Sequence, residues 1–216
     1  MPGADKPEKR RYDPARRRAA SAERRAAVIA AAHDAFERRG WAGTRVREVS
    51  EMAGVSQKTV EALFGTKAAL LRAAVDYAIR GDIERVPMPQ REAIAEMERA
   101  ADAATMLRLH ARHLRAVNSR SAGIAAVVEQ AAAADPAVSA LWRRMNRNRE
   151  YAVGWATDTF LAKRGRRRGL TRERVRTTFW VALDWGTFRT LTALAGLDAA
   201  GYERWLNEYY ERVLLP

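Results

Sequence analysis

A short run of polar side chains, between Ser56 and Glu61, is the part of this sequence best suited to recognition chemistry. Gln57, Lys58 and Thr59 stand in succession there. A glutamine amide suits the N6 and N7 edge of adenine, and a lysine ammonium suits O6 and N7 of guanine. Placed outward on a helix, these side chains would reach the base edges and phosphates of a DNA duplex.

The residues around this run fit a helix-turn-helix, which would hold it in place. Such a motif needs a glycine in its turn, because the chain there takes a positive φ that a Cβ resists, and Gly54 fills that position. Four residues earlier the two helices touch, so only a small side chain fits, and Ser50 stands there. The core between the helices requires apolar residues, and five comply: Val49, Ala53, Val55, Val60 and Leu63. An ordinary pair of antiparallel helices is the alternative that this pattern leaves open.

Helical periodicity extends before and after this motif. Apolar residues recur on one face of a first helix between Ser21 and Gly40. The next three helices have expected N-caps at Thr44, Ser56 and Thr66, and the last of them covers residues 67–80. Beyond a connector with two prolines, we expect helices at about 91–100, 103–119, 121–134, 136–164, 172–195 and 199–214. No segment alternates as a strand does, so the predicted fold class is all-α, with about nine to ten helices.

The first part of the chain resembles the TetR (tetracycline-repressor-like) family of transcriptional regulators over residues 29–71. The matching positions are Ala32, Phe36, Gly40-Trp41, Thr44, Val46, Val49, Ala53-Gly54-Val55-Ser56, Thr59-Val60, Phe64, Lys67 and Leu70-Leu71. The remaining residues agree with the family only in being helical and in total length. The resemblance implies a cytoplasmic homodimer that binds a palindromic double-stranded DNA operator as a repressor. It also implies release by a small-molecule inducer, without a cofactor.

The resemblance carries DNA contacts over to individual residues. Thr44, Arg45 and Arg47 would hold phosphate at the N-terminus of the second helix, where free amides and the helix dipole favour an anion. Lys67 would bind phosphate from the start of the fourth helix. The complete predicted DNA-binding set is Thr44, Arg45, Arg47, Ser56, Gln57, Lys58, Thr59, Glu61 and Lys67.

Two positions depart from the family pattern. The family usually has a tyrosine where Glu61 stands, and often a histidine or another polar residue where Leu63 stands. A carboxylate at the first position would be repelled by phosphate unless it accepts from a cytosine N4 or pairs with an arginine. This departure motivates a rival function, an all-helical dimeric ligand-binding protein whose helix-turn-helix no longer reads DNA.

The expected domain organisation follows from these elements. Residues 1–20 form a disordered basic arm, and residues 21–67 form the DNA-binding domain, with the motif at 45–64. A connecting helix at 68–80 leads to a ligand-binding and dimerisation domain at 81–216. In the family, the last two helices form a four-helix dimer interface, which here assigns Phe179, Leu183, Leu191, Trp205, Leu206 and Tyr209 to that interface.

Aromatic residues and two histidines indicate where a ligand could bind in the second domain. His110 and His113 are three positions apart on one helix and could ligate a metal or hydrogen-bond a ligand. Because no third metal ligand is in view, we predict no metal. Aromatic side chains could line an apolar cavity between helices, although core packing explains any single one. The predicted ligand-binding set is Met106, His110, His113, Trp142, Trp155, Trp185 and Phe188.

Composition excludes several classes of protein. The chain has no cysteine, which excludes disulfides and thiolate metal sites. No secretory signal and no run of about 18 apolar residues is present, so we expect no membrane partner. No glycine-rich phosphate loop or nucleophile elbow appears, so we expect no catalytic residues and no enzyme. The net charge of +13 favours a polyanionic partner, although the arginine excess could equally reflect a GC-rich genome.

Overall fold

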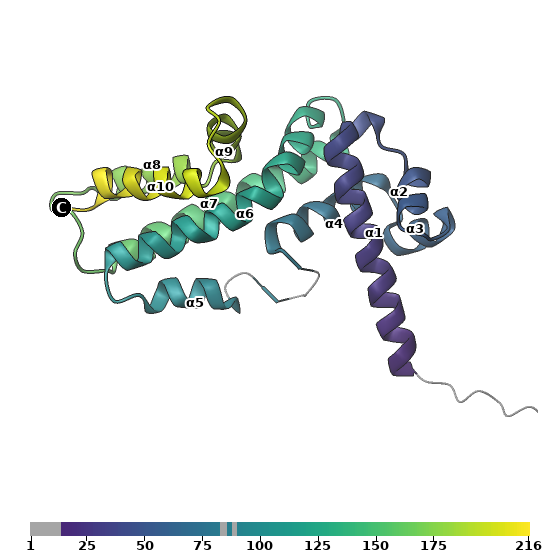
Figure 1. The fold of residues 1–216 in the computed structure, drawn as a ribbon, viewed down its shortest axis with the longest axis horizontal. Helices are drawn as coiled ribbons and strands as arrows, with labels where there is room; N and C mark the ends of the chain where they lie inside the picture. Colours follow the sequence, from purple (N-terminus) through teal and green to yellow (C-terminus); the bar gives the residue numbers. More distant parts are fainter. Residues whose placement is uncertain (1–13, 83–85, 88–89) are drawn as a thin grey trace, which may run out of the picture.

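The computed structural model describes residues 14–82, 86–87 and 90–216. The regular secondary structure in these residues consists of helices, without a strand (Figure 1). This confirms the predicted all-α class. In chain order the elements are α1 (Pro14–Gly43), α2 (Val46–Met52), α3 (Gln57–Phe64), α4 (Lys67–Arg80), α5 (Glu92–Arg99), α6 (Ala103–Ala131), α7 (Pro136–Leu161), α8 (Arg172–Ala182), α9 (Trp185–Arg189), the π-helical η2 (Thr190–Leu194) and α10 (Ala199–Leu214).

The elements form an elongated molecule with the helix-turn-helix at one end. α1 to α4 gather at that end, and the long helices α6 and α7 run from them along the body (Figure 1). α8 and α10 lie along one side of this long pair and α5 along the other, while α9 projects from the same side as α8 and α10. No helix in the described part of the chain is both long and apolar enough to span a membrane.

Three predicted helix boundaries are wrong. α1 begins at Pro14, so residues 14–20 are helical instead of forming an arm, and residues 1–13 lie outside the described part. The predicted helices 103–119 and 121–134 are one helix, since nothing near Ser121 interrupts it and that hydroxyl donates to Val117 O within the helix. The predicted helix 172–195 is interrupted, because Asp184 caps a new helix by accepting from Thr187 N at 2.7 Å.

Two hydrophobic cores share the long helices. The first joins Phe36 of α1 and Leu71 of α4 to Ile124 of α6 and Leu141 of α7. The second lies among α5, α8 and α10 and the other ends of α6 and α7, around residues such as Phe160. The two ends of the molecule are therefore joined by packing as well as by the chain, because both α4 and α1 pack directly on α6.

Candidate functional site

The turn between α2 and α3 has the geometry that the sequence predicts. Gly54 has a φ of 65°, and Val55 N donates to Ser50 O at 3.0 Å to close the turn. Ser50 is buried where the helices touch, and its hydroxyl donates to Arg47 O at 2.6 Å. Of the five predicted core positions, two are fully buried and three are half-buried against the same core: Val49 and Val60, then Ala53, Val55 and Leu63.

The second helix of this motif presents a polar surface to solvent. Ser56 caps α3 by accepting from Thr59 N at 3.1 Å. Gln57, Lys58 and Glu61 are exposed, and Gln57 Nε2 donates to Glu61 Oε1 at 2.8 Å. The partner of the Glu61 carboxylate is therefore a glutamine one turn earlier, a pairing that the i, i+4 spacing could have indicated.

Thr44 is neither the N-cap of α2 nor an exposed side chain that could contact phosphate, in contrast to both predicted roles. Arg45 is the N-cap residue of α2, and Thr44 is 2% exposed. The Thr44 hydroxyl lies 2.8 Å from Gly40 O and 3.1 Å from Ala35 O, so it fixes the bend after Gly40 and not a phosphate. Arg45 and Arg47 remain exposed at the start of α2, and Arg47 Nε lies 3.6 Å from a carboxylate oxygen of Glu51 on the same helix.

Lys67 is held by an intramolecular contact at the start of α4. Its ammonium donates to Trp41 O and lies 4.4 Å from the centroid of the Trp41 ring, which stacks on Phe36. Burial lowers the pKa of Lys67, and the charge of Asp135 opposes that shift. Because an ammonium has three donors, the contact with Trp41 leaves others for an outside acceptor.

Arg25 makes a structural contact that no sequence pattern indicated. Its guanidinium donates from Nη1 to Leu63 O at 3.2 Å and lies 4.5 Å from the centroid of the Phe64 ring. These contacts join α1 to the C-terminal end of α3. They constrain the angle at which α3 projects from the domain.

The second domain contains a cavity of about 390 Å³ between α4, α5, α6, α7 and α9. Four predicted ligand-binding residues line it: His110, His113, Trp155 and Trp185. Three other predicted residues do not, because each is used in packing. Met106 is fully buried in the second core, Phe188 packs on Tyr202 with ring centroids 4.7 Å apart, and Trp142 packs against the first core.

The two histidines of this cavity are neutral at physiological pH. His110 Nδ1 lies 2.7 Å from the Tyr210 hydroxyl, and burial lowers the pKa of His110 to about 3. Burial also lowers the pKa of His113 to about 4, assisted by the positive charges of Arg120 and Arg91. The histidines therefore offer hydrogen bonds without charge.

Arg149 is the charged side chain of the cavity that sequence reasoning missed. Its Nη1 pairs with Asp184 Oδ1 at 3.1 Å, and its Nη2 donates to Trp180 O at 2.8 Å. The guanidinium also lies over the Trp180 ring, 4.7 Å from its centroid. Arg149 Nε is buried without a hydrogen-bond partner among the described residues.

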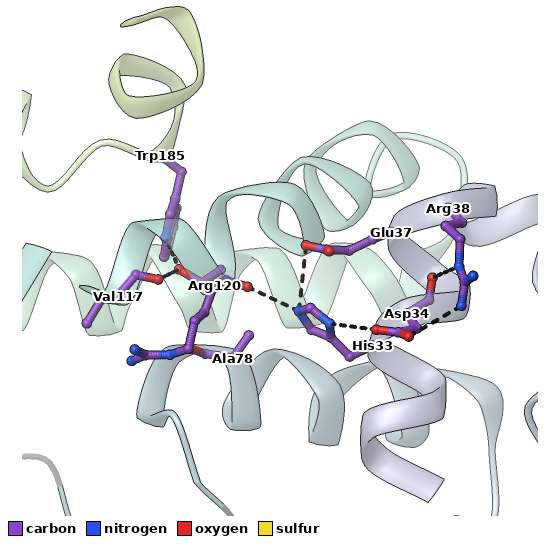
Figure 2. Close-up of polar contacts among 9 residues, drawn as sticks. His33, Asp34, Glu37, Arg38, Ala78, Val117, Arg120 and Trp185 are labelled. Atoms are coloured by element: carbon purple, nitrogen blue, oxygen red, sulfur yellow. Dashed lines mark hydrogen bonds and ion pairs between the residues drawn. The ribbon is translucent and has the colours of Figure 1, made fainter. Parts of the chain in front are cut away.

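A polar junction lies between this cavity and the helix-turn-helix domain (Figure 2). Trp185 of the cavity donates from Nε1 to Ser121 Oγ at 3.1 Å. The preceding residue, Arg120, accepts from His33 Nε2 at its carbonyl oxygen at 3.1 Å and donates from Nε to Ala78 O at 3.1 Å. One short segment of α6 therefore contacts α9, α1 and α4.

The predicted dimer surface contains two residues that cannot belong to it. Phe179 and Leu206 are fully buried inside the protomer, because α8 and α10 turn one apolar face toward the second core. The other predicted residues, Leu183, Leu191, Trp205 and Tyr209, are partly exposed. Two apolar side chains outside the predicted set are also exposed in this part of the chain: Leu194 is 82% exposed and Val181 is 38% exposed.

Comparison with known proteins gives the same fold. The family model of bacterial regulatory proteins, tetR family, matches residues 28–74. NalD, the secondary repressor of the MexAB-OprM multidrug efflux pump in Pseudomonas aeruginosa, is 18% identical, with a TM-score of 0.67 covering 90% of this chain and 98% of that chain. A proposed transcriptional regulator from Saccharomonospora viridis in complex with choline is 18% identical, with a TM-score of 0.64 covering 91% and 99%.

A third solved structure, a TetR transcription regulator from Haloarcula marismortui, is 15% identical, with a TM-score of 0.62 covering 90% of this chain and 99% of that chain. No curated protein matches the sequence. At these identities the solved structures establish the fold of the chain, and the family model matches a part of it that spans the helix-turn-helix.

Proposed function

We propose that this chain, which has the N-terminal domain and the overall fold of the TetR-family transcriptional regulators, binds a palindromic DNA operator as a cytoplasmic repressor. One observation carries the proposal. α3 stands exposed on a turn fixed by Gly54, with Gln57 and Lys58 facing solvent. This is the arrangement in which a recognition helix enters a major groove.

The DNA contacts divide into base readers and phosphate contacts. Gln57 and Lys58 read base edges from α3, while Arg45, Arg47 and Lys67 bind phosphates on either side. The Gln57–Glu61 hydrogen bond holds the glutamine amide along the helix before DNA arrives. Glu61 therefore positions a base-reading side chain, which removes the need for an arginine partner.

A homodimer supplies the second recognition helix. Leu183, Leu191, Leu194 and the stacked pair Trp205 and Tyr209 leave apolar surface on the helices that follow α7. Pairing two copies through this surface buries it and fixes the separation of the two α3 helices. Successive major grooves require a separation of about 34–36 Å.

Release by a small molecule follows from where the cavity lies. It is lined by Ile79, which follows Ala78 in α4, and by Trp185 of α9. At the junction, Ala78 O accepts from Arg120 and Trp185 donates to Ser121 (Figure 2). A ligand that binds better when α4 and α6 are shifted moves the protein toward that state, by no more than its difference in affinity. Operator DNA must then weaken ligand binding by the same factor. The choline complex of the Saccharomonospora viridis protein supports a small-molecule site in this fold.

The test is selection of bound sequences from random DNA duplexes. The full chain is expected to enrich a palindrome whose half-sites are centred about one helical turn apart. Gln57→Ala and Lys58→Ala are expected to lose preference at one position in each half-site. Arg204→Ala, which changes an exposed side chain of α10, is expected to keep the consensus. Enrichment of no sequence would support the rival function, a dimeric ligand-binding protein whose α3 no longer reads DNA, which the exposed carboxylate of Glu61 favours.

A further inference from the structure

We propose that the cavity of the second domain selects an uncharged, largely aromatic molecule that offers one hydrogen-bond acceptor to Arg149. This ligand class deepens the proposed function, since it describes the molecule that would release DNA. Binding of such a molecule to the cavity can be measured without DNA.

The walls of the cavity favour an apolar ring system. Ile79, Leu114, Val117, Met145 and Leu183 give it aliphatic walls, and Trp155 and Trp185 add aromatic ones. Its volume of about 390 Å³ lies within the range of about 300–1,000 Å³ typical of sites for small molecules. The exposed side chains of Asn148 and Tyr151 belong to the same lining and mark its opening to solvent.

The charge in the lining of the cavity is balanced by a neighbouring carboxylate. Arg149 is its charged lining residue, and the Asp184 carboxylate neutralises that guanidinium at 3.1 Å. His110 and His113 are neutral, as shown above. A charged ligand would therefore lose its hydration on entering the cavity without forming an ion pair there. This is unfavourable in a partly closed apolar site. By this reasoning a choline-like cation is not the ligand of this chain.

The remaining N–H donors of the Arg149 guanidinium indicate the polar group of the ligand. A guanidinium has five N–H donors in a fixed plane. Nη1 pairs with Asp184 and Nη2 donates to Trp180 O, and each of these two nitrogens carries a second N–H, whereas Nε is buried out of reach of solvent. A carbonyl oxygen brought into the cavity would accept from one of these second N–H groups of Arg149, which lines the cavity, and a neutral acceptor needs no counter-charge there.

The experiment compares three probes of similar size: methyl naphthyl ketone, naphthoate and naphthylmethylammonium. Calorimetric titration of the full chain at neutral pH is expected to show the ketone binding at least about tenfold more tightly than either ion. Methylnaphthalene, which has no acceptor, is expected to bind more weakly than the ketone. Equal or tighter binding of naphthoate or of the ammonium probe would overturn the proposal, as would binding of none of the probes.

Two opposite charge changes make the test specific. Asp184→Asn leaves the Arg149 charge unbalanced but keeps a side-chain oxygen able to cap α9. The affinity for naphthoate is therefore expected to rise about tenfold relative to the affinity for the ketone. Arg149→Gln leaves the Asp184 charge unbalanced, so the affinity for the ammonium probe is expected to rise instead. Because the guanidinium donors are removed, the ketone is expected to bind no more tightly than methylnaphthalene. Asp158→Asn, an exposed carboxylate of α7 paired with Arg172, is the matched control and is expected to change nothing.

The outcomes separate this inference from the proposed function. If both variants fold by circular dichroism and neither changes the order of the probes, the cavity does not select by charge and the proposal is wrong. If one variant fails to fold, the other still decides. A ketone that binds as expected but leaves the affinity for selected DNA unchanged would support the ligand class and refute ligand-driven release.

Discussion

Replacing Lys67 by methionine separates two roles of one ammonium group. The methionine side chain retains much of the aliphatic stem but cannot donate to Trp41 O or lie as a cation over the Trp41 ring. It also cannot bind a DNA phosphate. We therefore expect Lys67→Met to lower both the stability of the protein and its affinity for every DNA sequence.

The structural part of the loss can be estimated from the two contacts. A hydrogen bond from a charged donor contributes about 1.5–3 kcal/mol, and a half-buried cation over an aromatic ring about 1 kcal/mol. Burial of the ammonium, which lowers the pKa of Lys67, offsets part of this gain. A net loss of about 1–2 kcal/mol lowers the melting temperature of a chain of this size by about 2–8 °C.

The DNA part of the loss has a separate signature. Each phosphate contact contributes about −0.9 to the slope of log affinity against log salt concentration. Because the dimer loses one contact in each protomer, its slope should become less negative by about 1.8. The assays are thermal unfolding and titration of a selected duplex at several salt concentrations. Lys58→Met, on exposed α3, is the control that should not change the melting temperature. A lower melting temperature with an unchanged slope would show that Lys67 is structural only, and an unchanged melting temperature would refute the argument from Trp41.

Three further changes test other parts of the structure. Glu61→Gln removes a carboxylate from α3, so non-specific DNA binding should tighten while the selected consensus broadens; weaker non-specific binding in filter assays would contradict this. His110 and His113 have pKa values of about 3 and about 4, below the ordinary value of about 6.5, so the unfolded chain takes up more protons and stability falls as pH decreases below that value. Each histidine should lower the free energy of unfolding by about 2 kcal/mol between about pH 7 and pH 5. In denaturant titrations, His110→Gln and His113→Gln should each lose less stability over this pH range than the unchanged protein. Trp185→Phe and Ser121→Ala each remove the hydrogen bond at the junction, so the factor by which methyl naphthyl ketone weakens binding to a selected duplex should fall toward one; an unchanged factor would exclude this path.

The sequence predicted local features that depend on backbone geometry and failed where the packing partner decides. The turn at Gly54 and the caps at Ser56 and Thr66 follow from short-range rules, and all three are confirmed. Leu206 and Leu191 have the same side chain and lie on neighbouring helices. Leu206 lies in the core of the protomer, whereas Leu191 is partly exposed. Periodicity identifies an apolar face without saying what covers it.

The errors in the candidate site have the same origin. Thr44 matches the family pattern, yet the reversal of the chain after Gly40 turns its hydroxyl inward. Arg149 was missed because its value as a site residue depends on Asp184 and Trp180, which are far away in the sequence. Met106 was included because it lies one turn from His110, but it faces the second core.

The sharing of α6 and α7 between the two cores limits how the protein can be recombined. A hybrid regulator made by joining residues 1–80 to another sensing domain would keep Phe36 and Leu71 but lose Ile124 and Leu141, which complete the same core. The recognition half is therefore not an independent module that ends at the connector. A hybrid that folds must also carry the later half of α6 and the beginning of α7 from this protein. Its junctions with the other sensing domain then lie within these two helices.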